Sequence, residues 1–289
     1  MLSVFRQFKK YVKPLFGMGL LLVIFFNLEL KEIITNARNV NLIWLAPSLV
    51  ALFFSSYLSA LRWRKIASIY GVDISIDYAV RAYAQGISTS AVVPGGILGG
   101  DAWRVMSLKQ LNVVNKTAIT TVLADRLSGV WILATISAIA GIFSMLLTLW
   151  PDEEALYWIT SYQFVLGLLA LAPILAAVFA KELFNVLLKS SILSFGVQLS
   201  VLVAFGLCIR AVTPDFSWAL LFCLSAGIFI MATLPVSIGG FGPRELGAVF
   251  LLTGAGLTVE EGFLASLIYG ILCTVQGLLL TYYWIKMVK

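Results

Sequence analysis

The sequence predicts an all-α polytopic membrane protein, and three observations support this fold class. Hydrophobic residues occupy 61% of the 289 positions, charged residues occupy only 12%, and the mean hydropathy is +0.99, whereas a soluble globular domain is about 45–50% apolar. Several apolar runs approach or exceed the ~20 residues that a membrane-spanning helix requires. Two other stretches join an apolar arm, a proline, a glycine-rich break and a charged second arm. We therefore expect about six transmembrane helices and two broken, re-entrant helical hairpins in a single membrane domain, residues 1–289.

The apolar runs predict the membrane-spanning helices in chain order. They cover residues 15–30, 42–61, 118–149, 162–180, 191–212 and 262–285. The first run follows a basic segment and could be a signal peptide. We interpret it as a helix, because no small-residue cleavage site follows it and further spans come after it.

The charged residues at the ends of these runs predict the topology, because cytoplasmic loops carry an excess of Lys and Arg. The expected cytoplasmic set comprises Lys9, Lys10, Lys13, Arg62, Arg64, Lys65, Lys109, Lys116, Lys181, Lys189, Lys286 and Lys289. The acidic residues within 152–154 and 260–261 fall on the opposite side, so we expect both termini in the cytoplasm. A net charge of +6 spread in this way does not predict nucleic-acid binding, which needs a basic patch on a solvated domain.

The two broken hairpins, residues 75–113 and 217–256, have the same order of features. At a constant separation of 141 positions, the matches are Gly86/Gly227, Ala91/Ala232, Pro94/Pro235, Gly99/Gly240, Leu111/Leu252, Leu123/Leu264 and Gly129/Gly270. Three predicted spans separate the hairpins, and an odd number of spans inverts the second copy. We therefore expect an inverted repeat of the kind found in secondary transporters, with repeat 1 at about residues 42–149 and repeat 2 at about residues 191–285.

Proline and glycine residues mark the predicted helix breaks. Pro94 and Pro235 each remove a backbone donor. The glycines allow positive φ angles and close backbone approach; they are Gly95, Gly96, Gly99, Gly100, Gly239, Gly240 and Gly242. Second arms that start near Asp101 and Arg244 would direct free N–H groups and the positive helix dipole at an anion. Close helix packing through Gly-xxx-Gly spacing is the alternative role of these glycines.

Six charged residues in or beside the apolar segments are the candidate substrate-binding residues. They are Asp101, Arg104, Asp125, Arg126, Arg244 and Glu245. Ionisable groups at membrane depth cost about 2.5–3.5 kcal/mol each on insertion scales, so something must compensate them. One interpretation is a structural pair, such as Asp125 with Arg104. The other is an arginine fork for phosphate, with the acids orienting the arginines or meeting a cationic headgroup.

Several classes of site do not fit the composition. The sequence contains no histidine, and its three cysteines, in apolar runs, have no CxxC spacing, so the usual zinc site and the common serine-hydrolase triad are excluded. A nucleotide-binding loop of the GxxxxGK[ST] kind is missing from the sequence as well. We therefore expect no metal, no cofactor and no direct hydrolysis of ATP.

Three motifs together resemble a known membrane family. PGGILGGDAWR at 94–104, ADRLSGV at 124–130 and PVSIGGFGPRELG at 235–247 are similar, in this order, to the flippase-like transmembrane domain of lysylphosphatidylglycerol synthases and its standalone relatives. The resemblance implies an inverted-repeat helical fold and movement of lipid between leaflets, with the charged residues and glycines of the three motifs at the substrate site. The synthases carry a soluble aminoacyl-transfer domain after the membrane part, and this sequence ends at Lys289, so we expect no lipid-lysylating activity from it.

The hypothesis that follows is a non-enzymatic lipid translocase, a flippase or scramblase, in a bacterial or archaeal cytoplasmic membrane. Its substrate would be a phospholipid or a polyprenyl-phosphate lipid, recognised through the phosphate headgroup. A membrane-embedded transferase acting on polyprenyl-phosphate sugars is one alternative, with Asp152, Glu153 and Glu154 as its candidate carboxylates. A non-transporting envelope scaffold is the other. The protein partners left open are a second copy of the chain and enzymes of envelope biosynthesis.

Overall fold

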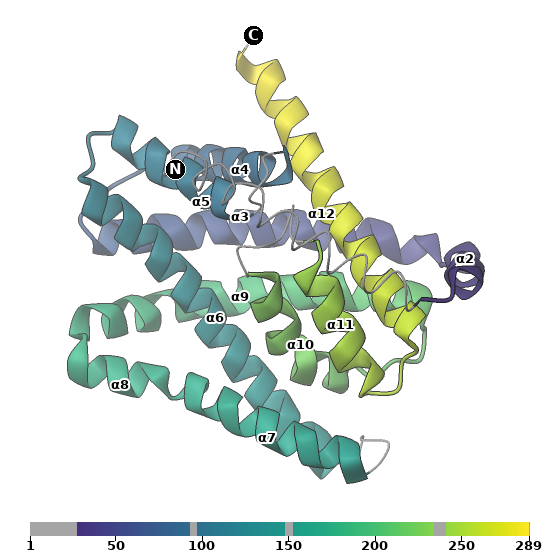
Figure 1. Cartoon of the computed structure of the whole chain (residues 1–289). Helices are drawn as coiled ribbons and strands as arrows, with labels where there is room; N and C mark the ends of the chain where they lie inside the picture. Colours follow the sequence, from purple (N-terminus) through teal and green to yellow (C-terminus); the bar gives the residue numbers. More distant parts are fainter. Residues whose placement is uncertain (1–27, 93–96, 148–152, 234–240, 289) are drawn as a thin grey trace, which may run out of the picture.

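The computed structural model describes residues 28–92, 97–147, 153–233 and 241–288, and this part of the chain folds as helices (Figure 1). A short helix α2 (Leu30–Arg38) and a 3₁₀ turn η1 (Leu42–Trp44) precede the main bundle. The long helices are α3 (Leu45–Ile69), α6 (Asn115–Leu146), α9 (Lys181–Val212) and α12 (Val259–Val288). The shorter helices are α4 (Ile76–Val92), α5 (Ile97–Gln110), α7 (Glu153–Ala170), α8 (Ala172–Phe179), α10 (Trp218–Ala232) and α11 (Pro243–Thr253).

Five segments of the described chain are long and apolar enough to cross a membrane. They are Leu42–Ile69, Asn115–Leu146, Thr160–Phe179, Lys181–Val212 and Val259–Tyr283. These segments overlap five of the six predicted runs, which confirms those five predictions. The sixth prediction, residues 15–30, lies almost entirely outside the described residues.

Two pairs of shorter helices occupy the predicted hairpins. Helices α4 and α5 have 17 and 14 residues, and α10 and α11 have 15 and 11; each is shorter than the ~20 residues that a span requires. Within each pair the two helices pack against each other. Pro94, Gly95, Gly96, Pro235, Gly239 and Gly240, the predicted break residues between the paired helices, lie outside the described residues.

The second arm of the first hairpin does not begin where the sequence predicts. Helix α5 begins at Ile97, so Asp101 lies one turn inside it and not at its first residue. Gly99 and Gly100 are helical, and a Cβ added to Gly100 would come within 2.6 Å of the Gly86 carbonyl oxygen. This glycine is therefore needed for close packing of α5 on α4, the alternative role considered for it.

The second hairpin starts its second arm where the sequence predicts. Helix α11 begins at Pro243, and the preceding Gly242 has a φ of +102°. L side chains rarely adopt that angle, whereas glycine does so without strain. Among the predicted break glycines that the structure describes, Gly242 is the one that uses positive φ.

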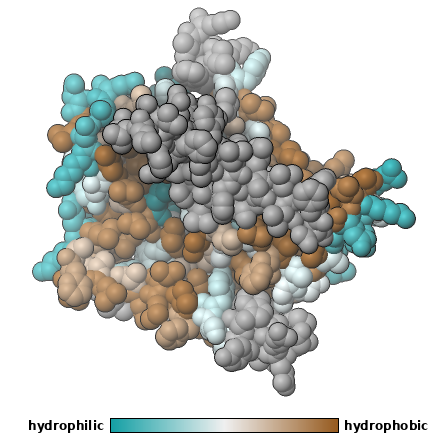
Figure 2. Space-filling model, viewed as in Figure 1, coloured by the Kyte–Doolittle hydropathy of each residue, from teal (hydrophilic) through white to brown (hydrophobic). Residues whose placement is uncertain are grey.

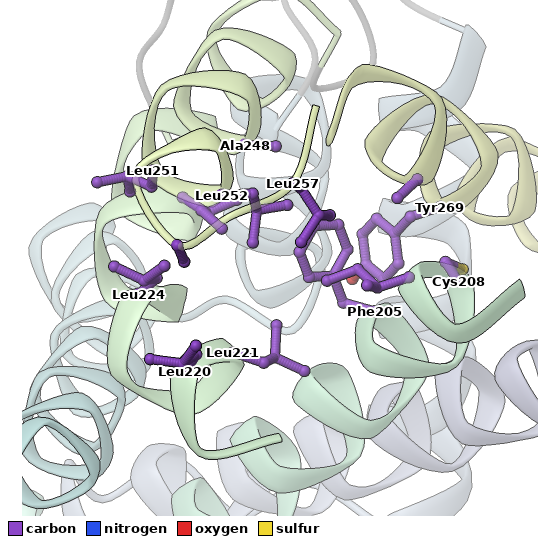
Figure 3. Close-up of a cluster of buried hydrophobic side chains, with 14 of the residues drawn as sticks. Phe205, Cys208, Leu220, Leu221, Leu224, Ala248, Leu251, Leu252, Leu257 and Tyr269 are labelled. Carbon is purple, nitrogen blue, oxygen red and sulfur yellow. The ribbon is translucent and has the colours of Figure 1, made fainter. Parts of the chain in front are cut away.

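The bundle core is built mainly from the second half of the chain, with Leu52 of α3 packed into it. Helices α3 and α9 lie side by side, and α12 crosses them diagonally (Figure 1). Helices α9 to α12 enclose a cluster of buried side chains around Phe205, Leu221, Leu224 and Leu252 (Figure 3). The Phe205 ring makes an edge contact with Tyr269 at 5.3 Å between centroids. This packing holds α12 and its residue Tyr269 in a fixed position beside the candidate site.

The outer surface has the character expected of a protein in lipid. Figure 2 shows hydrophobic side chains over most of the visible face outside the grey atoms, and hydrophilic ones gathered at its left and right edges. Large apolar side chains such as Phe179, Ile192 and Leu146 are more than 70% exposed. Such exposure would be unfavourable in water, so these faces are suited to contact with acyl chains.

Candidate functional site

Asp125, in α6, is the centre of a buried ion cluster. Its side chain is almost completely buried. Arg62 of α3 donates from Nε to Oδ1 at 2.7 Å, and Arg104 of α5 donates from Nη1 to Oδ2 at 2.7 Å. One carboxylate therefore joins three helices, and both of its oxygens are occupied.

Asp101, in α5, extends the cluster towards the surface of a cavity. It accepts from Arg104 Nη2 at 2.5 Å on Oδ1, and from Arg126 Nε at 2.6 Å on Oδ2. Arg126 Nη2 also donates to Asp101 Oδ1 at 2.9 Å, which makes this contact two-pronged. Three guanidinium groups thus share two carboxylates, and the cluster of Arg62, Asp101, Arg104, Asp125 and Arg126, here called the Asp125 cluster, has a net charge of +1.

Arg104 and Arg126, two of the arginines of the predicted site, differ in access. Arg104 is packed over the Tyr83 ring at 4.7 Å and near Trp63 at 5.7 Å, and only 5% of its side chain is exposed. Arg126 has 34% of its side chain exposed. Arg126 is therefore the arginine of the Asp125 cluster that a ligand can reach most readily, while Arg104 is fixed by two acids and two aromatic rings.

Two cavities adjoin the Asp125 cluster. The larger, about 340 Å³, lies among α3, α4, α5 and α12, and the smaller, about 260 Å³, lies among α3, α6, α9 and the end of α10. Both are lined by Ser55, Ser59, Tyr83, Arg104, Arg126, Val201 and Tyr269. The two cavities therefore adjoin each other, and they are here called the larger and the smaller chamber. Ligand pockets are usually about 300–1,000 Å³, and the volume of the larger chamber falls within that range.

Arg244 and Glu245, at the start of α11, form a second and separate cluster. Glu245 accepts from Arg244 Nη2 at 2.5 Å and from the Gly242 N–H at 2.6 Å, and it is fully buried. Arg244 also donates to the Ser266 hydroxyl at 3.2 Å. This neutral group, here called the Glu245 cluster, lines neither chamber. Tyr269 connects the two regions, because it lines both chambers and lies 5.4 Å below the Arg244 guanidinium.

A family model described as "Lysylphosphatidylglycerol synthase TM region" matches residues 11–280. The chain belongs to this family. The match covers nearly the whole sequence and confirms the family resemblance that the three motifs indicated. No curated protein matches the chain in a sequence search. Within the described residues, no group of His, Cys, Asp and Glu side chains could hold a metal ion.

In this member of the lysylphosphatidylglycerol synthase TM region family, the predicted site residues fall into two sets. Asp101, Arg104, Asp125 and Arg126 come together beside the chambers, and Gly100 lines the larger chamber and packs against Gly86. The predicted pair of Asp125 with Arg104 is formed. Arg244, Glu245 and Gly242 form the Glu245 cluster instead, so the structure does not unite the arginines of the two hairpins around one cavity.

The sequence interpretation missed Arg62. It assigned this residue to the cytoplasmic edge, whereas Arg62 is buried and bonded to Asp125. A signal was present, because Ser48, Ser55, Ser59 and Arg62 recur at helical spacing and all lie on the buried side of α3. A polar stripe on one face of an otherwise apolar helix is typical of a face turned to the bundle interior.

Proposed function

We propose that the protein moves a phosphate-bearing lipid between the two leaflets of the membrane, as a transporter and not as an enzyme. The observation that carries the proposal is the cavity wall formed by the Asp125 cluster inside a bundle with apolar outer faces. Ionisable groups within membrane segments commonly mark a substrate path. Membership of the family supports a role in membrane lipid handling.

The chemistry of the wall favours a phosphate. Guanidinium groups present several N–H donors in a planar fork that matches two phosphate oxygens. Arg126 is partly exposed to the chambers, and the cluster has one more guanidinium than carboxylates. A monoanionic phosphodiester entering here would neutralise the net charge of +1.

We also propose that the hairpins α4–α5 and α10–α11 are re-entrant and form the two halves of an inverted repeat. Support comes from equivalent positions at the separation of 141. Arg104 bonds to residues 101 and 125, and Glu245 bonds to the equivalent residues, Gly242 and Ser266. The two residues therefore bond to equivalent positions, with Arg104 as a donor to two carboxylates and Glu245 as an acceptor from a backbone N–H and a hydroxyl. Broken helices placed this way bring polar groups towards the midplane of transporters.

Arg126 provides the most direct test, because its partial exposure makes it less important for folding than Arg104. The assay is dithionite quenching of a tail-labelled fluorescent phospholipid in proteoliposomes that contain the full chain. We expect Arg126→Ala to lower the rate of translocation by about tenfold or more, since a charge-assisted hydrogen bond contributes about 1.5–3 kcal/mol. Arg126→Lys is expected to restore part of the rate, because it keeps the charge but loses the fork.

The matched control is Arg81→Ala. Arg81 is exposed on α4 and pairs with Asp77 at the surface, so its removal should leave the rate unchanged. If the wild-type protein does not raise lipid movement above that of protein-free vesicles, or if Arg126→Ala moves lipid at the wild-type rate, the proposed function is wrong.

A further inference from the structure

We infer that α10 bends at residues 222–227, here called the α10 hinge, and that Ser137 and Tyr162 are the positioning residues that permit the bend. The movement displaces the wall of the smaller chamber. The inference rests on the proposed function for the purpose of this movement, which is to let a lipid headgroup pass. The hinge itself follows from hydrogen bonds that α6 and α7 make to the backbone of α10.

The first contact places a hydroxyl group of α6 at one rung of the hydrogen-bond ladder of α10. In a regular α-helix the Ala226 N–H donates to the Phe222 carbonyl, four residues earlier. Ser137 Oγ donates to that carbonyl at 2.8 Å and accepts from that N–H at 3.0 Å. Ser225 Oγ donates to the same carbonyl at 2.8 Å. Hydroxyl groups therefore match both lone pairs of the carbonyl, and the N–H has an acceptor outside its own helix.

The second contact engages the next N–H along α10. The Gly227 N–H donates to the Tyr162 hydroxyl at 2.7 Å, and this hydroxyl donates to the Leu224 carbonyl at 3.4 Å. Tyr162 belongs to α7, so side chains of two different helices hold two successive N–H groups of α10. The second of these groups belongs to a glycine, the residue type that, apart from proline, is least favourable inside a helix.

These contacts lower the cost of bending α10. In the membrane interior, a backbone N–H or C=O group that loses its helical partner is unfavourable unless another group replaces it. The hydroxyl groups of Ser137, Ser225 and Tyr162 provide that replacement. Sharp helix bends occur where a side chain enters the hydrogen-bond ladder. The rungs that join residues 222 to 226 and 223 to 227 can therefore open and close with little change in free energy.

The hinge divides α10 into a fixed part and a part that borders the smaller chamber. Before the hinge, Leu221 is buried in the core around Phe205 (Figure 3). After the hinge, four residues at the inner end of α10 line the smaller chamber: Phe229, Ile230, Ala232 and Thr233. Thr233 lies six residues beyond Gly227, about 9 Å along the helix, so a bend of about 20° would move it by about 3 Å.

The hinge is specific to the second hairpin. In α4, the first arm of the other hairpin, Ser88 and Thr89 donate to carbonyls of their own helix, those of Ala84 and Gln85. Within the described residues, no side chain of another helix accepts from an N–H group of α4. We therefore expect α10, and not α4, to bend.

Distances between spin labels measure the bend without depending on transport. The labels are placed at Thr233→Cys and Lys189→Cys, both exposed, in the full chain with its native cysteines replaced by alanine. Double electron–electron resonance then reports the distance from the inner end of α10 to α9. We expect two populations that differ by about 3 Å or more, the displacement that a sharp bend produces.

Ser137→Ala should leave one of these populations. Alanine removes the hydroxyl, so the rung from Ala226 to Phe222 is the arrangement that still satisfies the N–H, and α10 stays straight. Tyr162→Phe is the second variant and should act in the same direction. Thr135→Val is the matched control, because the Thr135 hydroxyl donates to the Trp131 carbonyl of its own helix, α6, at 2.9 Å. It should retain both populations.

Stability and translocation distinguish a hinge from a structural strut. If Ser137 only joined α6 to α10, its removal would lower the unfolding midpoint in detergent and leave the label distances unchanged. For a hinge, we expect Ser137→Ala to unfold no earlier than Thr135→Val, because a backbone hydrogen bond takes the place of the hydroxyl. Translocation in proteoliposomes should fall several-fold in the same variant.

The outcomes separate the hinge from the proposed function. One population in the unsubstituted labelled protein, or two populations that persist in folded Ser137→Ala and Tyr162→Phe, overturns the inference. Loss of one population with translocation at the wild-type rate also overturns it, because the bend would then not serve lipid movement. Loss of one population in a protein that moves no lipid supports the hinge and overturns the proposed function.

Discussion

The Asp125 cluster and the Glu245 cluster each hold buried charges, yet the first is open to two chambers and the second is closed. In the first, three arginines share two aspartates and face two chambers. In the second, one arginine and one glutamate neutralise each other; Ser266 donates to the same Glu245 oxygen as Arg244, and the Gly242 N–H donates to the other oxygen. The difference teaches that a buried charge by itself does not identify a binding site. A net charge on the cluster and a cavity beside it are what indicate a binding site.

The surroundings of the two clusters explain this difference. Around Glu245, the rings of Phe241 and Tyr269 cover Arg244 at 5.2 and 5.4 Å. Around Asp125, the rings of Tyr83 and Trp63 cover Arg104, but Arg126 extends from the next position of α6 into the chambers. The Glu245 cluster is therefore suited to fixing the start of α11, and the Asp125 cluster to meeting a ligand.

The largest expected difference concerns the orientation of the two hairpins in the membrane, because a single cysteine is labelled either from one side of the membrane or from the other. After replacement of the native cysteines, single cysteines at Lys65, Lys109 and Thr258, all exposed, would be tested with an impermeant maleimide in oriented vesicles. We expect residues 65 and 109 to label from the cytoplasmic side and residue 258 from the other side. Labelling of 65 and 109 from opposite sides would make α4–α5 a full span and remove the inverted repeat.

A substitution in the closed Glu245 cluster should lower the free energy of unfolding more than the corresponding substitution in the open Asp125 cluster. Glu245→Gln removes the charge that neutralises Arg244 in a fully buried setting, and breaking a buried pair in this way costs about 3–5 kcal/mol. The measurement is the thermal or denaturant unfolding of the purified protein in detergent. Glu182→Gln, at the exposed start of α9, is the control and should unfold like the wild type.

The open cluster should lose less stability from the equivalent change. In Asp125→Asn one of the two acceptor oxygens that bind Arg62 and Arg104 is replaced by an NH₂ donor, so one guanidinium loses its acceptor. The adjoining chambers can admit water or an anion to replace it. We expect a loss of about 2 kcal/mol, the range for one hydrogen bond to a charged group. A loss equal to or larger than that of Glu245→Gln would show that the Asp125 cluster is as closed as the other.

Unfolding and lipid-translocation measurements on Asp125→Asn together distinguish a structural role of Asp125 from a role in transport. If translocation per folded molecule stays at the wild-type level while stability falls, Asp125 is a structural pair with Arg104. If the fold survives and lipid movement stops, the carboxylate belongs to the transport path.

The smallest expected effects concern two glycines, one on α6 and one on α12, that the proposed repeat would pair. A Cβ on Gly270 would overlap the Arg244 guanidinium and approach the Phe241 ring at 2.6 Å, whereas one on Gly129 would meet Gln198 Nε2 at 2.9 Å. Gln198 lines the smaller chamber and can move into it. We expect Gly270→Ala to destabilise by about 1–3 kcal/mol and Gly129→Ala by less than about 1 kcal/mol. Equal unfolding midpoints for the two variants would contradict this contrast.

The sequence by itself determined the all-helical membrane class and identified most of the charged residues of the candidate site. Five apolar spans, the two pairs of short helices and the pairing of Arg104 with Asp125 were predictable, because lipid permits only apolar faces outside and forces charges to find partners inside. The start of α11 was also predictable, since Gly242 and Pro243 each restrict the backbone.

Tertiary structure alone decided which charges meet and which of them face a cavity. Arg62 is 63 positions from Asp125 in the chain, and its position near the end of an apolar run is equally compatible with a surface residue. Arg126 and Arg244 are each next to an acid in the sequence, yet Arg126 lines a chamber and Arg244 is enclosed by aromatic rings. Spacing along a helix fixes the face on which a residue lies, but the helices packed against that face determine whether it meets a partner, a ring or open space.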